Sequence, residues 1–131
     1  MTINLAAVVN DIEMEQGASV EVPFAITRSS SPLDLTGFTL NLQVRRTFAD
    51  TSTIINCTTA NGRLVWVNQA GGTFKLVLAP DATTGIRFTA DEQTEGSLTG
   101  VYDLEIQDTA SGFVYKGVKG AWVINREVTR V

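Results

Sequence analysis

The sequence predicts an all-β protein, an antiparallel sandwich or small barrel of about eight short strands. Three observations support this prediction. Apolar residues recur at every second position in most apolar segments, which is the period of a half-buried strand. Turn residues separate these segments at regular spacing. The one helical candidate, residues 80–84, spans only a turn or two, with Pro80 and Asp81 where a first turn favours them.

The strands follow one another along a chain of 131 residues, a length that suits one domain. Residues 20–27 alternate between apolar and more polar side chains. Pro23 has no N–H to donate, so this strand is expected at a sheet edge or with an edge-facing position there. Residues 38–45 show the clearest alternation. Further strands are expected at residues 53–58, 64–67, 74–78, 101–107, 113–118 and 121–126.

Residues 1–18 form the one ambiguous segment, ahead of a sandwich domain predicted over residues 19–131. Leu5–Val9 is apolar and fits either an extra edge strand or an arm that docks on a neighbouring protein. Within the sandwich domain, Asp108–Gly112 is expected to be a tight hairpin loop, and Asn61-Gly62 another turn.

Composition and charge exclude several classes of function. The net charge is −4 and the basic residues are scattered, with Arg45-Arg46 as the one doublet, so no cationic face for nucleic acid is predicted. A single cysteine rules out an intrachain disulfide, as expected for a protein made in a reducing cytosol. Neither a signal peptide nor an apolar run long enough to cross a membrane is present.

Catalytic chemistry has little support in this sequence. Histidine is absent, which removes the commonest general base and metal ligand. We interpret Cys57 as a small buried residue of a strand. Two acidic clusters could supply carboxylate ligands for calcium: Asp11, Glu13 and Glu15, and Asp91, Glu92 and Glu95. Neither cluster has the spacing of a calcium-binding loop, and both are better explained as solvated loops. We therefore expect no enzyme, no cofactor and no metal site.

Four blocks of the sequence, in order, resemble a phage domain found at the N-terminus of baseplate upper proteins and in small proteins that accompany tail-fibre genes. The first is Pro32–Arg45, with its Leu33-Asp34-Leu35-Thr36-Gly37 turn. The others are Gly72–Leu76, Gly100–Ile106 and Gly120–Val128, followed by Thr129-Arg130. This resemblance implies an immunoglobulin-like β-sandwich of about 7–9 strands in a virion, where it links the tail or baseplate to a receptor-binding fibre.

The chain departs from that group in two ways: it ends with the domain, and it begins with the extra segment 1–18. These departures favour a free-standing adaptor or decoration subunit. Its expected partners are other phage structural proteins, with no nucleic acid or membrane, in several symmetric copies within a virion assembled in the host cytoplasm. The candidate contact residues are Leu5, Val8, Val9, Pro23 and Trp66.

Two alternatives remain at this point. One is a capsid decoration or head-fibre protein. The other belongs to a different class, a carbohydrate-binding sandwich that uses Trp66 or another exposed aromatic residue, although core burial is the better explanation for both Trp66 and Trp122. For the leading hypothesis, we expect that deletion of residues 1–16 leaves a folded domain that no longer enters particles; loss of folding would identify an integral strand.

Overall fold

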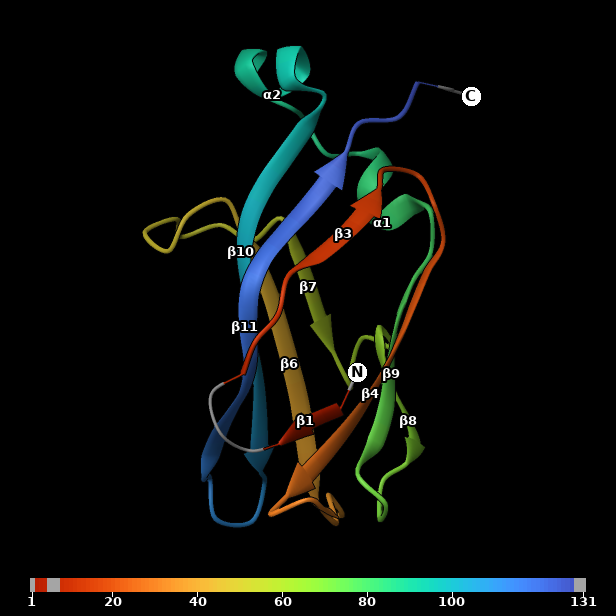
Figure 1. Ribbon diagram of the computed structural model, residues 1–131, viewed down its shortest axis with the longest axis vertical. Coiled ribbons are helices and arrows are strands. Elements are labelled where there is room, and N and C mark those ends of the chain that lie inside the picture. Colours follow the sequence, from red (N-terminus) through yellow and green to blue (C-terminus); the bar gives the residue numbers. More distant parts are fainter. Residues whose placement is uncertain (1, 5–7, 129–131) are drawn as a thin grey trace.

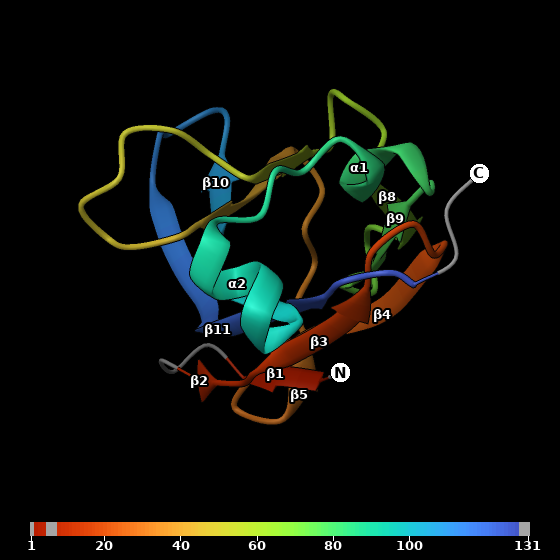
Figure 2. The ribbon, with the colours of Figure 1, turned by 90° about the horizontal axis from the view of Figure 1, so that it is seen from above.

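The computed structural model describes residues 2–4 and 8–128 and consists of two β-sheets packed face to face (Figures 1 and 2). The five-stranded sheet has the order β1-β4-β9-β8, with β5 beside β4. Its strands are β1 (Thr2–Asn4), β4 (Val20–Arg28), β5 (Ser31–Pro32), β8 (Leu64–Asn68) and β9 (Thr73–Leu78).

The six-stranded sheet has the order β2-β11-β10-β6-β7, with β3 beside β11. Its strands are β2 (Val8–Val9), β3 (Ile12–Glu15), β6 (Phe38–Arg45), β7 (Ile55–Thr58), β10 (Ser97–Asp108) and β11 (Val114–Asn125). The neighbours β4-β9-β8 and β7-β6-β10-β11 reproduce the two sheets of an immunoglobulin sandwich. The predicted fold class is confirmed.

The core lies between the sheets because each strand turns its apolar alternate residues inward. In β6, for example, Leu40, Leu42 and Val44 are buried while the intervening residues are partly exposed. Trp122 is fully buried and meets Tyr102 edge to face, with ring centroids 5.3 Å apart. Burial raises the pKa of the Cys57 thiol to about 11, so this side chain is an uncharged part of the core, as predicted.

The turn that opens the first resembling block is held by its own side chains. The Asp34 carboxylate accepts hydrogen bonds from the backbone N–H and the hydroxyl of Thr36, at 2.9 and 2.6 Å. Gly37 follows with a φ of +82°, a conformation that glycine adopts without strain. Leu35 is completely buried. The turn is therefore held by local hydrogen bonds and anchored in the core by Leu35.

Two elements differ from the sequence-based expectation. Residues 113–118 and 121–126 were expected to be separate strands, but the structure has the single strand β11 (Val114–Asn125), which continues through Gly117 and Gly120. Glycine weakens strand propensity, yet it also permits close approach of another backbone. A Cβ at Gly120 would lie only 2.0 Å from the carbonyl oxygen of Asn10, so glycine at this position lets the N-terminal segment lie directly beside β11.

The described residues contain two short helices, where the sequence predicted at most one. The predicted turn is α1 (Asp81–Thr84), and the second is α2 (Ala90–Glu95), in the stretch interpreted as an acidic loop. A capping box starts α2: the Thr89 side chain accepts from the Glu92 N–H, and the Glu92 side chain accepts from the Thr89 N–H. Both helices lie at the end of the sandwich opposite the β10–β11 hairpin (Figure 1).

No helix in the described part of the chain is long and apolar enough to cross a membrane.

Candidate functional site

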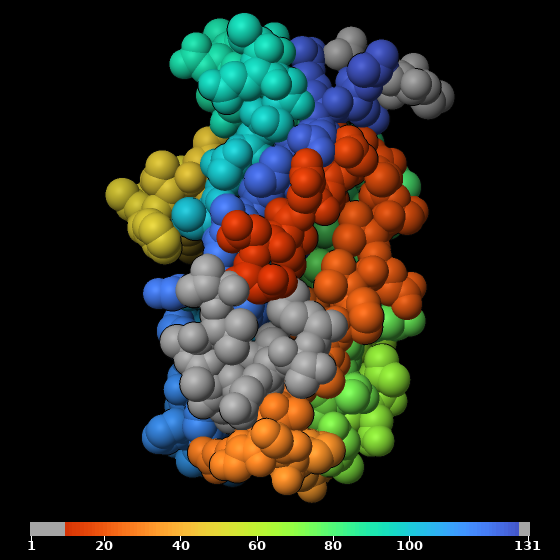
Figure 3. All heavy atoms as spheres, viewed as in Figure 1, coloured from red at the N-terminus to blue at the C-terminus, as the bar shows by residue number. Residues whose placement is uncertain are grey.

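Residues 10–16 of the N-terminal segment are fixed against β11. β3 pairs in parallel with β11, from Ile12 opposite Trp122 to Glu15 opposite Asn125. Ile12 and Met14 are buried, and the indole N–H of Trp122 points at the Met14 sulfur, 3.2 Å away. Figure 3 shows this segment lying alongside β11. These residues therefore contribute an edge strand to the six-stranded sheet.

Polar contacts secure the start of this segment at Asn10. Its N–H donates to the Lys119 carbonyl at 2.9 Å, and its own carbonyl accepts from the Tyr102 hydroxyl at 2.7 Å. Burial, with a smaller contribution from the Asp11 carboxylate, raises the pKa of Tyr102 to about 12. The phenol therefore remains protonated and able to donate at all ordinary pH values.

Of the candidate contact residues in the N-terminal segment, Leu5 lies outside the described residues. Val8 and Val9 form β2, which pairs in parallel with β11 at Val118 and Lys119. β2 and β3 thus lie one after the other along the same side of β11, at the edge of the six-stranded sheet.

Pro23 and Trp66 lie on opposite faces of the five-stranded sheet. Pro23 is exposed in β4, opposite Lys75. β4 lies between β1 and β9, and β1 pairs with Ala25–Thr27 of β4. Pro23 precedes that paired stretch, so the side of β4 that faces away from β9 is an edge at Pro23.

Trp66 belongs to an edge strand, β8, yet its ring faces inward. The ring is half-buried and meets Phe74 edge to face at 5.9 Å, and Phe74 stacks on Phe24 at 5.0 Å. Pro23 and Trp66 therefore do not share a surface, and Trp66 offers only part of its ring to a partner.

The most exposed aromatic residue is Phe48, at 85% exposure, in the loop between β6 and β7 that projects from one side of the molecule (Figures 1 and 3). Beside it is a shallow hollow of about 260 Å³ on the outer face of β6, β10 and β11, here called the outer hollow. Its lining also includes Arg45, Val101, Asp103 and Lys119. Strand register brings them together, because Val101 pairs with Arg45 and Asp103 pairs with Lys119.

Two of the charged groups in the outer hollow are held in place by neighbours. The Arg45 guanidinium donates to the Gln43 side-chain oxygen at 2.8 Å and to the Asp50 carbonyl at 3.0 Å. The Asp103 carboxylate lies 3.4 Å from the Lys116 ammonium, which also pairs with Glu105. The hydrogen bond between Lys116 and Glu105 raises the pKa of Lys116, although partial burial acts in the opposite direction.

A cluster of three aromatic residues lies at the β10–β11 hairpin end of the sandwich. Tyr115 contacts Phe113 at 4.8 Å and Phe38 at 6.2 Å, and the Arg28 guanidinium lies 5.7 Å from the centre of the Tyr115 ring. Phe113 is 58% exposed. The sequence offered a signal for Phe48 and Phe113, since each is an aromatic residue beside polar loop residues, but strand periodicity assigned Phe113 to a strand.

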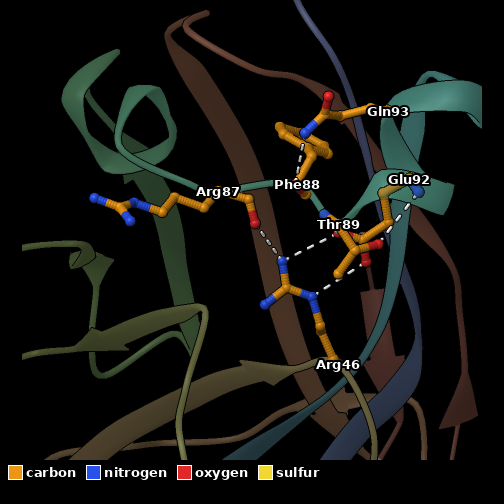
Figure 4. A network of polar contacts seen from close by, with 6 residues as sticks. All are labelled: Arg46, Arg87, Phe88, Thr89, Glu92 and Gln93. Carbon is orange, nitrogen blue, oxygen red and sulfur yellow. Dashed lines mark hydrogen bonds and ion pairs between the residues drawn. The ribbon is translucent and has the colours of Figure 1, made fainter.

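Arg46, adjacent to Arg45, has a different role: it ties the β6 end to α2 (Figure 4). Its guanidinium binds both carboxylate oxygens of Glu92 at 3.1 Å and donates to the Arg87 carbonyl at 2.7 Å. Partial burial acts to raise the pKa of Glu92, but the bonds from Arg46 and Thr89 outweigh it and hold the pKa below its ordinary value of 4.5.

A Glu92→Gln variant is expected to lose about 1 kcal/mol of stability at neutral pH, because it removes the charge that pairs with Arg46, while the glutamine oxygen can still accept from the Thr89 N–H. A lowered folded-state pKa contributes stability above the unfolded pKa and loses it as the pH falls through the folded value. The difference from the parent chain should therefore shrink below about pH 4. Urea unfolding between pH 3 and 7 measures this, with exposed Glu95→Gln in the same helix as the control; a constant difference would contradict it.

No group of three or more potential metal ligands occurs among the described residues. The acidic residues of the N-terminal cluster form hydrogen bonds with β11. Asp11 accepts from the Ala121 N–H, and Glu13 and Glu15 accept from the Asn125 side chain. In the second cluster, Glu92 is engaged by Arg46.

Comparisons with known proteins show the fold and no family. No family model and no curated protein matches the chain. Among solved structures, the N-terminal domain of phage TP901-1 ORF48 is similar with a TM-score of 0.50 and 10% identity, over 95% of this chain and 96% of that one. The natural killer cell receptor NKp44 has a TM-score of 0.47 and 15% identity, over 92% of this chain and 99% of that one.

Proposed function

We propose that this chain is a structural protein of a bacteriophage particle, a small adaptor that connects the tail or baseplate to fibres or tailspikes through protein–protein contacts. The observation that carries the proposal is its likeness, over 95% of its length, to the N-terminal domain of a phage protein. The identity of 10% limits that likeness to the fold, so the proposal also depends on the sequence blocks.

Those blocks supply the second line of support because they occupy connected parts of one framework. The Leu33–Gly37 turn leads into β6, Gly72–Leu76 runs into β9, Gly100–Ile106 lies in β10, and Gly120–Val128 contains the end of β11. β6, β10 and β11 are neighbours in the six-stranded sheet. The resemblance therefore follows the residues that build the sandwich, in their order along the chain.

The surfaces available to partners are consistent with an adaptor. Two separate regions are available: Phe113 with Tyr115 and Arg28 at the hairpin end, and the sheet edge formed by β2 and β3. Aromatic residues and arginine are enriched in interface hot spots. A protein with two such regions can contact two neighbours at once, which is what joining a tail to a fibre requires.

The proposal is tested by locating the chain in particles produced by the phage genome that encodes it. Mass spectrometry of purified particles should detect the chain, and electron microscopy with a labelled chain should place it at the tail or baseplate. Label on the head would replace the tail role with the capsid-decoration alternative. Absence of the chain from purified particles would overturn the virion role altogether.

A further inference from the structure

The outer hollow combines an exposed aromatic ring with fixed hydrogen-bonding groups of both kinds. We infer that it binds a saccharide unit, with the sugar ring on Phe48 and its hydroxyls bound by Arg45, Asp103 and Lys119. This site is independent of the virion role, because it follows from the residues that line the hollow.

The polar lining matches the hydrogen-bonding needs of a sugar. Each sugar hydroxyl donates one hydrogen bond and accepts others, so a sugar needs donors and acceptors side by side. Arg45 and Lys119 supply donors, and Asp103 supplies acceptor oxygens. A guanidinium has five N–H donors, so Arg45 keeps donors for a ligand after its bonds to Gln43 and Asp50. These two bonds also fix its orientation before a ligand arrives.

The apolar contacts come from Phe48 and Val101. The face of an aromatic ring carries partial negative charge, which attracts the weakly positive C–H groups of a sugar ring. Phe48 is 85% exposed, so its ring is accessible, and Val101 adds an aliphatic surface at the strand-lined side of the hollow. A few placed polar groups around an apolar contact surface are typical of small-molecule sites.

The charged groups around the hollow leave one donor free for a ligand. Two cations and two carboxylates line the hollow: Arg45, Lys119, Asp103 and Glu105. Both carboxylates pair with the Lys116 ammonium beside the hollow, whereas Lys119 has no ion-pair partner among the described side chains. The Lys119 ammonium can therefore donate to a sugar hydroxyl without breaking an ion pair.

The experiment titrates the ¹⁵N-labelled 131-residue chain with the methyl glycosides of glucose, galactose, N-acetylglucosamine and rhamnose. At least one glycoside should give saturable amide shifts in β6 and β10, with a dissociation constant on the order of 1 mM. Binding of none of these sugars up to about 50 mM would overturn the inference.

Substitutions decide where a binding sugar sits. Phe48→Ala should weaken binding at least about tenfold, and Asp103→Asn at least about threefold, through lost stacking and lost acceptor strength. Phe113→Ala is the matched control, since it removes an exposed phenylalanine outside the hollow and should leave affinity unchanged. Both phenylalanines are largely exposed, so neither variant threatens folding. Equal affinity of the Phe48→Ala variant and the parent chain would exclude the outer hollow as the site.

Discussion

Deletion of residues 1–16 is expected to unfold the chain or remove at least about 5 kcal/mol of its stability, whereas deletion of residues 1–9 leaves a folded domain. The boundary lies at Asn10, where the fixed part of the N-terminal segment begins. This prediction replaces the expectation from sequence that residues 1–16 could be removed without harm.

The reason is the burial of β3. Ile12 and Met14 are 7% and 5% exposed and cover the buried Trp122. Truncation of a buried aliphatic side chain costs about 2–5 kcal/mol, and the deletion removes two together with a row of backbone hydrogen bonds to β11. Among the described residues, deletion of residues 1–9 removes the short pairings of β1 with β4 and of β2 with β11.

Urea unfolding followed by tryptophan fluorescence measures both deletions, because Trp122 lies under β3. The 1–9 deletion also serves the proposed function: a folded chain that fails to enter particles would assign an assembly role to the removed segment. A 1–16 deletion as stable as the parent chain would show that β3 contributes nothing to the core.

A Gly120→Ala variant is expected to lose about 3 kcal/mol of stability. The added Cβ would lie 2.0 Å from the Asn10 oxygen and 2.7 Å from the Asn10 carbonyl carbon. Both are backbone atoms fixed by hydrogen bonds to Lys119 and Tyr102, so no side chain can rotate to make room. The N-terminal segment must move away from β11, which breaks those hydrogen bonds.

Gly117→Ala is the matched control on the same strand. A Cβ there would approach only the ends of the Leu104 and Ile106 side chains, at 3.3 Å, which a small shift accommodates. Its cost should stay within about 1 kcal/mol. In a chain that lacks residues 1–11, the two glycine substitutions should cost nearly the same, because the Asn10 backbone and the Asp11 side chain that crowd the added Cβ are gone. A persistent excess cost of Gly120→Ala in that background would place its cause elsewhere.

Elements with strong local patterns could be predicted from the sequence, and those formed by contacts could not. The β6 strand and the Leu33–Gly37 turn were predictable because alternation and Asx-turn chemistry act within a few residues. The helix α2 was predictable in principle from its Thr89–Glu92 capping box, but its acidic composition suggested a loop. β3 has too short a pattern for sequence reasoning and forms because β11 offers it an edge.

The candidate site shows the same division. An exposed aromatic residue could be anticipated as a class, but Phe48 and Lys119 are 71 positions apart in the sequence and meet only through the pairing of β6, β10 and β11. Trp66, a candidate chosen for its residue type, instead completes a row of rings with Phe74 and Phe24. Residue type identifies a possible contact residue, whereas strand position decides which way it faces.

By itself, the sequence determined an all-β sandwich whose alternating strands bury one face, since period-two patterning and turn residues act locally. It also determined the lack of a histidine-based site and of an intrachain disulfide. Only the tertiary structure decided that Ile12 and Met14 of the N-terminal segment belong to the core and that Arg45, Phe48, Asp103 and Lys119 surround one hollow. The physical reason is register: contacts between distant strands depend on which residues pair across the sheet, and that pairing is a property of the whole fold.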